Sequence, residues 1–209
     1  VNGCVSAPET VTGTVYPIPA KPTTDGDERC GSGVVSLSAS GSANCDSLIW
    51  FSDANLTNRV NVGATYSPDI NVTTTYYVIC KSVNGCVSDA QSVTGTIYPI
   101  PAAPQTGGDS RCGAGQVTLT ASGSANCDSL IWFSDANLTN RVATGSSYSP
   151  TISGTTTYYV ICKSVNGCVS NATEVTGTIN PIPAKPTTTG DTRCGTGTVN
   201  LSASGSADC

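Results

Sequence analysis

The hexapeptide VNGCVS begins at Val1, at Val83 and at Val165, a spacing of 82 residues each time. Aligned position by position, residues 1–82 and 83–164 are identical at 62 of 82 positions. Self-similarity at a fixed period is typical of repeat architectures, in which each repeat forms one structural unit. The sequence therefore predicts a tandem array, and its function is best inferred from the repeated unit.

Proline-rich segments mark the boundaries between the folding units. YPIPAKP, YPIPAAP and NPIPAKP occur 82 residues apart, starting at Tyr16, Tyr98 and Asn180. Proline fixes φ, so these segments favour stiff, extended connections. We expect the following division: 1–17 as the last strand of a preceding domain, 18–99 and 100–181 as complete domains, and 182–209 as the first half of a following domain.

The repeated unit consists of short strand-like segments. Val34–Ser40 alternates apolar and polar residues, Ser47–Phe51 is apolar on both faces, and Thr73–Cys80 and Ser92–Tyr98 are rich in β-branched and aromatic residues. No segment has the 3.6-residue apolar period of a helix. Short strands at regular intervals predict an all-β fold, with tandem immunoglobulin-like β-sandwich domains in an extended array. In that plan Val34–Ser40 is strand B, and Trp50 is the core tryptophan of strand C.

Cysteines are numerous, and their setting indicates disulfides. A domain near 80 residues buries only about 60% of its unfolded surface, so its core alone is a marginal source of stability. The chain has 11 cysteines, no histidine and no Cys-x-x-Cys pair. The usual zinc ligand sets are missing, and disulfides in an oxidising compartment are favoured.

Strand geometry limits which cysteines can pair, because the two Cα atoms must come within about 7 Å. Cys30 and Cys45 flank a strand roughly 20 Å long and cannot be partners. Cys45, at the start of strand C, and Cys80, at the end of strand F, fall at the same end of neighbouring strands. We therefore expect Cys45 to bond Cys80, and Cys127 to bond Cys162.

The second pair of each repeat has two solutions. Cys30 could bond Cys86 within one domain, which needs a bent or shortened first strand because these residues fall at opposite ends of an immunoglobulin plan. In a head-to-tail stack Cys30 could instead reach Cys168 of the next domain. Cys112 faces the same choice, and the sequence leaves both schemes open.

Composition argues against several classes of function. Charged residues make up 11% of the chain and the net charge is -5, whereas nucleic-acid binders need clustered Lys and Arg. No apolar run approaches the length of a membrane helix, so no membrane insertion is expected in this segment. Without histidine, and with cysteines in disulfides, we expect neither catalysis nor cofactors. Only Asp27, Asp109 and Asp191 recur in the acidic turn, too few oxygens for calcium, so no metal site is expected.

At this point the sequence resembles a known family. GDERCGSG, TTTYYV, NGCVS and PIPAKP, in this order, are similar to the Ig-like repeats of Bacteroidetes cell-surface proteins, often found in giant adhesins exported by the type IX secretion system. The resemblance covers the whole chain. It implies a secreted, disulfide-bearing repeat that extends or displays something, and it does not identify a ligand.

Two kinds of surface feature are candidate sites. The tripeptide DSL resembles the Asp-Ser/Thr-hydrophobic signal of O-glycosylation in Bacteroidetes, which places sugars on Ser47 and Ser129. Asn-x-Ser/Thr acceptor triplets occur at Asn55, Asn71, Asn137, Asn171 and Asn200. If Leu48 and Trp50 face the core, the opposite face carries a candidate contact patch: Ile49, Phe51, Tyr77 and Ile79.

The sequence favours a non-catalytic structural segment of an extracellular bacterial fibre or adhesin stalk. Its expected partners are neighbouring repeats of the same chain or identical chains in a filament, together with covalent glycans. A rival interpretation makes each repeat a carbohydrate- or protein-binding module. Another makes the array an accessory to a secreted hydrolase.

Overall fold

The structure is a computed structural model of the chain and describes residues 2–206. It divides into two compact units, Val1–Pro99 and Ile100–Cys209, and the division falls inside the YPIPAAP segment. Across residues 2–206 the regular elements are all strands, with no helix among them. Val1 and residues 207–209, the end of the expected half domain at 182–209, lie outside the described part.

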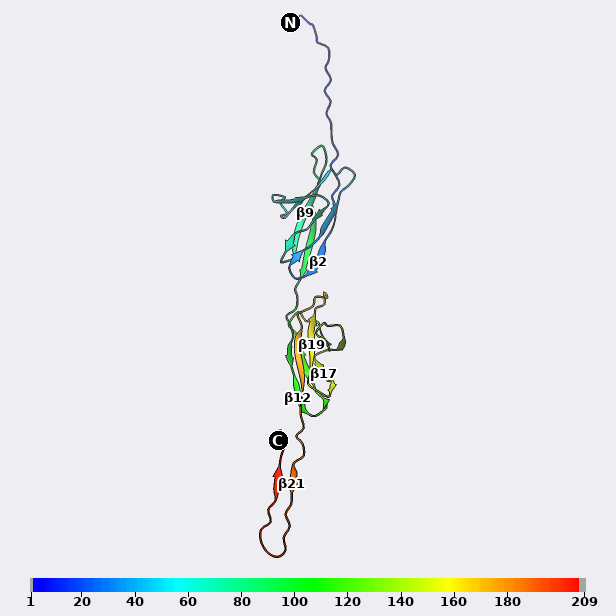
Figure 1. Cartoon of the computed structure of the whole chain (residues 1–209). Coiled ribbons are helices and arrows are strands. Elements are labelled where there is room, and N and C mark those ends of the chain that lie inside the picture. The colour runs from blue at the N-terminus through cyan, green and yellow to red at the C-terminus, as the bar shows by residue number, and fades with distance from the viewer. Residues whose placement is uncertain (1, 207–209) are drawn as a thin grey trace. The chain divides into compact units, whose positions relative to one another are not determined.

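The first unit is a β-sandwich (Figure 1). Its larger sheet has the order β2-β10-β9-β5-β6, and its smaller sheet has the order β1-β4-β7, with a separate two-stranded pair β3-β8. All pairings are antiparallel except that of β2 with β10, which is parallel. The strands are β1 Thr23–Asp25, β2 Asp27–Cys30, β3 Gly33–Val34, β4 Leu37–Ser40, β5 Ser47–Phe51, β6 Arg59–Val62, β7 Thr65–Tyr66, β8 Asp69–Ile70, β9 Thr74–Lys81 and β10 Gln91–Tyr98.

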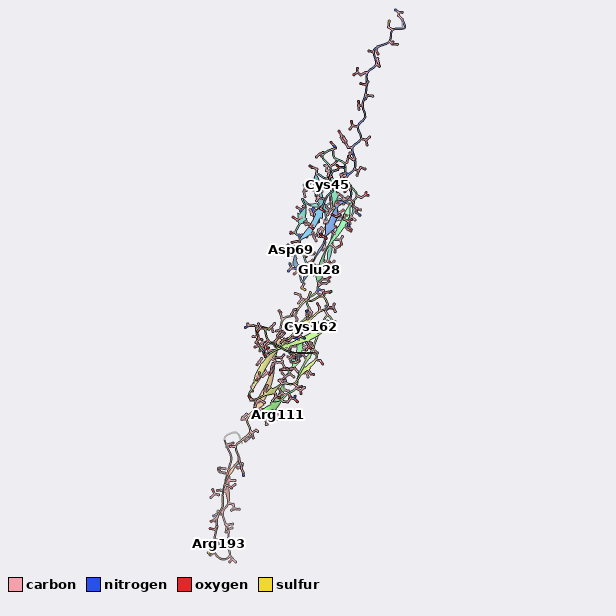
Figure 2. All side chains as sticks on the ribbon, turned by 90° about the vertical axis from the view of Figure 1, so that its right-hand side faces the viewer. Glu28, Cys45, Asp69, Arg111, Cys162 and Arg193 are labelled. Atoms are coloured by element: carbon pink, nitrogen blue, oxygen red, sulfur yellow. A yellow bond between two sulfur atoms is a disulfide. The ribbon has the colours of Figure 1, made fainter. Side chains whose placement is uncertain are left out.

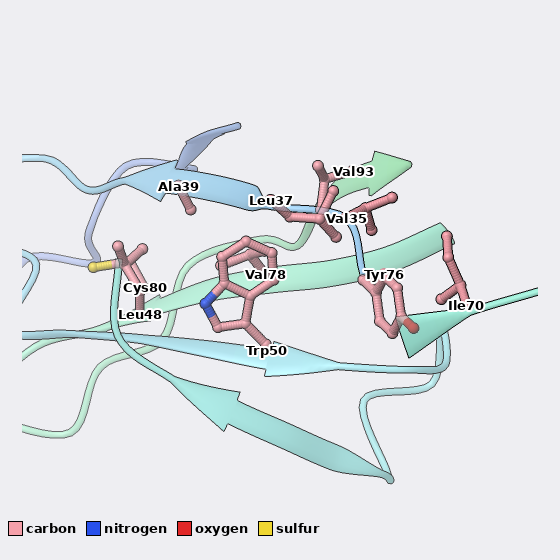
Figure 3. Close-up of a cluster of buried hydrophobic side chains, with 10 residues drawn as sticks. All are labelled: Val35, Leu37, Ala39, Leu48, Trp50, Ile70, Tyr76, Val78, Cys80 and Val93. Atoms are coloured by element: carbon pink, nitrogen blue, oxygen red, sulfur yellow. The ribbon is translucent and has the colours of Figure 1, made fainter. Parts of the chain in front are cut away.

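The core lies between the two sheets and is centred on Trp50, which is fully buried (Figure 3). One side of it comes from the alternating residues Val35, Leu37 and Ala39. The other side comes from β5, β9 and β10, where every second residue points inward because strand side chains alternate between faces. The members of this cluster are Val35, Leu37, Ala39, Leu48, Trp50, Ile70, Tyr76, Val78, Cys80 and Val93.

The segment Val34–Ser40, predicted as one strand, is divided in the structure into β3 and β4. The alternation holds, because Val35, Leu37 and Ala39 are all buried. The pairing partners, however, change along the segment, since β3 pairs with β8 whereas β4 pairs with β1 and β7. Between them the Ser36 N–H donates to the Asp27 carboxylate at 2.7 Å, and this side-chain acceptor replaces a ladder partner.

The second unit repeats the same sandwich with sheets β12-β20-β19-β15-β16, β11-β14-β17 and β13-β18. Trp132 is fully buried at its core, as Trp50 is in the first unit. The strands are β11 Gln105–Gly107, β12 Asp109–Cys112, β13 Gly115–Gln116, β14 Leu119–Ser122, β15 Ser129–Phe133, β16 Arg141–Thr144, β17 Ser147–Tyr148, β18 Thr151–Ile152, β19 Thr156–Lys163 and β20 Thr173–Asn180.

Two segments lie outside the sandwiches. Residues 2–17 form no strand, so their assignment to a preceding domain stays a prediction. After the second sandwich, β21 (Thr187–Thr189) and β22 (Ser202–Ser204) pair antiparallel, with Thr187 opposite Ser204. This is the register of β1 and β4, where Thr23 lies opposite Ser40.

Candidate functional site

Each sandwich contains one internal disulfide at the start of strand β5 or β15. Cys45 bonds Cys80 and Cys127 bonds Cys162, with Cα–Cα distances of 5.4 Å in both. These are the two pairings that strand geometry predicted. The bond is closely packed, because a Cβ atom added at Gly41 would collide with the Sγ of Cys45. It ties the central strands of the larger sheet together at one end.

A hydrogen-bonded turn fixes Cys30 at the other end of the first unit. The Asp27 carboxylate accepts the N–H of Glu28 at 2.9 Å and that of Ser36 at 2.7 Å. Nη1 of Arg29 donates to the Val34 oxygen at 2.9 Å across Gly33. The repeated motif Asp-x-Arg-Cys-Gly-x-Gly is therefore a rigid turn that holds its cysteine in place. Asp27, considered for calcium, serves main-chain N–H groups instead.

Neighbouring side chains strengthen this end in the first unit. The Tyr98 hydroxyl donates to the Glu28 carboxylate at 2.9 Å, and this hydrogen bond raises the pKa of Tyr98. The second unit has Asn180 and Ser110 at these positions, so this contact belongs to the first unit.

A second rigid turn, at SVNGC, fixes Cys86. The Ser82 N–H donates to the Cys86 oxygen at 2.9 Å, and the Cys86 N–H donates back to the Ser82 hydroxyl at 3.1 Å. Gly85 turns the chain at φ +85°, a conformation that favours glycine. The Cys86 thiol lies 3.8 Å from the Tyr16 oxygen. Ser164 and Cys168 make the same two hydrogen bonds in the second unit.

The two cysteine turns of one unit lie at opposite ends of its strands. Cys30 is opposite Tyr98, the last residue of β10, whereas the Cys86 turn directly follows β9 and precedes the start of β10. Seven residue steps along β10 span about 23 Å, far beyond the Cα separation of a disulfide. Figure 2 shows this separation, with Cys45 toward one end of the first unit and Glu28 toward the other, as Cys162 and Arg111 are in the second.

The intradomain scheme, in which Cys30 bonds Cys86, is therefore wrong. Cys86 and Cys112, which we assigned to disulfides from the sequence, carry free thiols in this structure. The physical reason is placement: Cys30 and Cys86 lie at opposite ends of the strands, and Cys45 and Cys80 near the Cys86 turn are bonded to each other. The other free thiols among residues 2–206 are Cys4 and Cys194.

A groove beside the internal disulfide occurs at the same place in both units. Its volume is about 310 Å³ in the first unit and about 300 Å³ in the second. Ser47 and Ser129, the candidate O-glycosylation residues, line it together with the acids Asp46 and Asp128. Ser124, whose hydroxyl lacks a hydrogen-bond partner, also lines the second groove. Ser47 and Ser129 are each half-buried.

The candidate acceptors Asn55 and Asn137 lie exposed in the loop that follows the core tryptophan. In the first unit the Asp53 carboxylate accepts the N–H groups of Asn58 and Thr57, at 2.7 and 3.1 Å. These main-chain hydrogen bonds hold the pKa of Asp53 below its usual value, and the bond from Asn58 has the largest effect. Leu56 lies in the left-handed region at φ +59°, an uncommon conformation for leucine, so the loop has a defined shape. Asn71, Asn171 and Asn200 are also exposed.

The candidate contact patch lies on the face of the larger sheet that points away from the core. Ile49 is directly opposite Ile79, and Phe51 is opposite Tyr77, on adjacent antiparallel strands. The four side chains are therefore neighbours. Phe51 and Ile79 are buried, with 9% and 6% of their surface exposed, while Ile49 and Tyr77 are half-buried. The apolar area available to a partner is correspondingly small.

Among residues 2–206, no group of three or more His, Cys, Asp or Glu side chains is arranged to hold a metal ion. The same residues contain no helix of the length and hydropathy needed to cross a bilayer.

The comparisons with known proteins agree with the fold. Residues 19–99 and 101–181 each match the family model described as "Ig-like domain CHU_C associated". Curated proteins give no significant match.

Solved structures give distant likenesses. Fibronectin(III)-like modules of Clostridium thermocellum CbhA match with 12% identity and a TM-score of 0.44, covering 77% of this chain and 94% of that one. A titin I-band fragment, I67-I69, matches with 13% identity and a TM-score of 0.40, covering 90% and 77%. Murine CEACAM1b matches with 12% identity and a TM-score of 0.42, covering 77% and 100%.

Proposed function

The chain belongs to the family of Ig-like domains described as CHU_C associated, and on this premise we propose that it is a structural segment of an extracellular fibre or adhesin stalk. In this role the repeats set reach and mechanical continuity and perform no catalysis themselves. Recurrence of one small sandwich, with 62 of 82 positions identical, supports the proposal, because repeat number then converts directly into length.

The observation that carries the proposal is the placement of the two ends of one repeat. Within the first unit the incoming segment, at Tyr16 and Pro17, lies beside the Cys86 turn, where Pro17 shares a pocket with Val83 and Asn84. The outgoing segment starts after Tyr98, at the opposite end of β10. Chain entry and chain exit are thus separated by a full strand length, as a link in a linear array requires.

Disulfides support an extracellular location. The internal Cys45–Cys80 bond closes 35 residues within a domain whose own core is small. Disulfides form and persist in oxidising compartments and are rare where thiols are kept reduced. We therefore propose that the chain acts outside the cell or on the cell surface.

Covalent glycans are proposed as part of the same role. Ser47 and Ser129 line equivalent open grooves, and Asn55 and Asn137 occupy equivalent exposed loops. Glycans there would add polar bulk to a chain whose charged fraction is only 11%. Mass spectrometry of peptides from native material tests this. Unmodified peptides at all four residues would remove glycans from the proposal.

The stalk function is tested by scattering from chains of increasing length. Chains with two, four and six repeats should show a maximum dimension that increases by roughly 40 Å per repeat, the long dimension of a sandwich with strands of this length. Radii of gyration that grow as those of compact proteins would contradict the proposal. Electron microscopy of native material should show filaments with the same axial step.

A further inference from the structure

We propose that the proline linkers have a second function, which is to protect the chain against proteases outside the cell. This function deepens the proposed stalk function and rests on it for its purpose, because a stalk keeps its reach only while its linkers are intact. It follows from the order of residues in the linker, from the burial of the linker prolines and from the placement of the Lys and Arg residues.

The linkers carry the side chains that common proteases recognise. Exposed connecting segments are preferred sites of proteolytic cleavage. Tyr16 is 48% exposed, and Ile18 and Ile100 are 71% and 52% exposed. Lys21 is exposed as well. Trypsin-like enzymes select a basic residue before the cleaved bond and chymotrypsin-like enzymes a large apolar one, so both classes find their recognition residue here.

Proline follows each of these recognition residues. In YPIPAKP the bonds concerned are Tyr16–Pro17, Ile18–Pro19 and Lys21–Pro22. YPIPAAP keeps the first two pairs and has alanine in place of lysine before its last proline, and NPIPAKP keeps the isoleucine and lysine pairs. Proline has no N–H and its ring restricts the preceding residue, so a bond that precedes proline fits poorly into a protease cleft. The linkers therefore present recognition residues without a cleavable bond after them.

One bond of YPIPAKP, Ala20–Lys21, has proline on neither side, and the structure places it between two buried prolines. Pro19 and Pro22 are buried in the first unit. Their equivalents in the second unit, Pro101 and Pro104, are buried as well. Proteolysis of a folded segment goes through a locally opened state. Cleavage at this bond therefore requires both flanking prolines to leave the sandwich.

The Lys and Arg residues within the sandwiches are protected by hydrogen bonds. The Lys81 oxygen accepts the N–H of Asp46 at 3.0 Å, and the Ser82 N–H donates to the Cys86 oxygen at 2.9 Å. Both polar groups of the bond after Lys81 are thus occupied, and the bond after Lys163 has equivalent partners at 3.0 and 2.9 Å. The arginines of the two sandwiches all lie in paired strands: Arg29, Arg59, Arg111 and Arg141.

Arg193 and Lys185 separate the effect of proline from the effect of the sandwich. Both are exposed and neither lies in a strand. Arg193 precedes Cys194, whereas Lys185 precedes Pro186. We therefore expect trypsin to cleave after Arg193 and to leave the bond after Lys185 intact.

Trypsin digestion of the folded, oxidised chain tests the proposal, with mass spectrometry of the products over time. In the parent we expect cleavage after Arg193 alone. Pro22→Ala should add cleavage after Lys21 at a rate comparable to that after Arg193. Pro104→Ala is the matched control, because it removes the equivalent buried ring behind an alanine and creates no basic site. It should keep the digestion pattern of the parent.

A transfer of the lysine to the second linker gives an independent readout. Ala103→Lys should stay uncleaved after position 103, whereas Ala103→Lys/Pro104→Ala should be cleaved there. Cleavage after Lys21 in the parent, or resistance of that bond in Pro22→Ala, would overturn the proposal. Cleavage after Lys81 as fast as after Lys21 in Pro22→Ala would also overturn it, because unfolding of the sandwich would then explain both.

Chymotrypsin extends the test to the aromatic residue of the linker. Pro17→Ala should be cleaved after Tyr16, and the parent should not be. Pro181→Ala, in which the preceding residue is Asn180, is the matched control and should stay intact at that bond. Resistance of Pro17→Ala after Tyr16 would remove the aromatic pair from the proposal. These digests do not depend on the length added per repeat, so scattering decides the stalk function separately.

Discussion

The indole Nε1 of Trp50 donates a hydrogen bond to the main-chain oxygen of Gly63 at 2.7 Å, from a fully buried side chain. Trp50→Phe removes the donor, leaves the Gly63 oxygen without this partner and opens space in the core. We expect the free energy of unfolding of the first unit to fall by about 2 to 4 kcal/mol. Hydrogen exchange should become faster in peptides from β5 and β9.

The second unit is an internal control for this change. Trp132 makes the equivalent hydrogen bond to Gly145 at 2.8 Å. Peptides from β15 and β19 should keep their exchange rates in Trp50→Phe, and the reverse should hold in Trp132→Phe. Equal effects in both units from a single substitution would show that the two sandwiches do not unfold separately.

A glycine in strand β20 makes room for the core. A Cβ atom at Gly177 would lie 2.9 Å from side-chain carbons of both Ile152 and Val117. Gly177→Ala should therefore cost about 1 to 3 kcal/mol by overpacking. Gly154→Ala in the same unit meets nothing within 4 Å and should change stability by less than about 0.5 kcal/mol. Denaturant unfolding of the two variants measures the difference, and equal midpoints would contradict the packing argument.

The internal disulfide should make a large contribution to the stability of the first unit. Bonding residues 35 apart restricts the unfolded chain, and the loop-entropy relation gives about 4 kcal/mol for a loop of this length. Cys45→Ala/Cys80→Ala should lower the free energy of unfolding of the first unit by about 2 to 4 kcal/mol. Cys4→Ala, an exposed thiol outside the sandwich, is the control. If Cys4→Ala lost stability and Cys45→Ala/Cys80→Ala did not, the stabilising role of the Cys45–Cys80 bond would be contradicted.

The sequence predicted the sandwich, the core tryptophan and the internal disulfides because these depend on alternation and on strand ends. Leu48, Trp50, Tyr76 and Val78 alternate inward over β5 and β9, and a one-residue shift of register would turn a strand's set to the other face. The division of Val34–Ser40 could not be predicted, since Val35 and Leu37 continue one alternation while their pairing partners change. A carboxylate from Asp27, nine residues away from Ser36, decides where that strand is interrupted.

The candidate sites were predicted less completely. Alternation placed Ile49, Phe51, Tyr77 and Ile79 on one face, and the register brings them together. Alternation does not predict that Phe51 and Ile79 are buried there. Parallel pairing of β2 with β10 was also missed, because Asp27–Cys30 has no apolar alternation to reveal a strand. That pairing places Cys30 directly opposite Tyr98.

The loop after β5 should respond to acid. Because hydrogen bonds hold the pKa of Asp53 below its usual 3.8, the loop is stabilised by the ionised carboxylate at pH above that value. This contribution is lost as pH falls from 3.8 through the lower pKa of the folded state. Amide signals of Thr57 and Asn58 should shift in that window. Asp53→Asn, which has no ionisable group, should show no such titration, and a titration that persists there would contradict the assignment.

Ile49 lies in the candidate contact patch on the outer face of the larger sheet, and we expect this patch to contact identical chains in a filament. Ile49 is half-buried and has Ile79 on one neighbouring strand and Val62 on the other, so a lysine there can reach solvent while charging the centre of the face. Ile49→Lys should leave the fold intact within about 1 kcal/mol. It should weaken lateral association by roughly tenfold or more, as sedimentation velocity would measure.

Val72→Lys, at a site 63% exposed, is the matched control and should associate like the parent. Equal association of all three chains would remove this face as the lateral contact, while loss of folding in Ile49→Lys, seen by circular dichroism, would show that the face is part of the core.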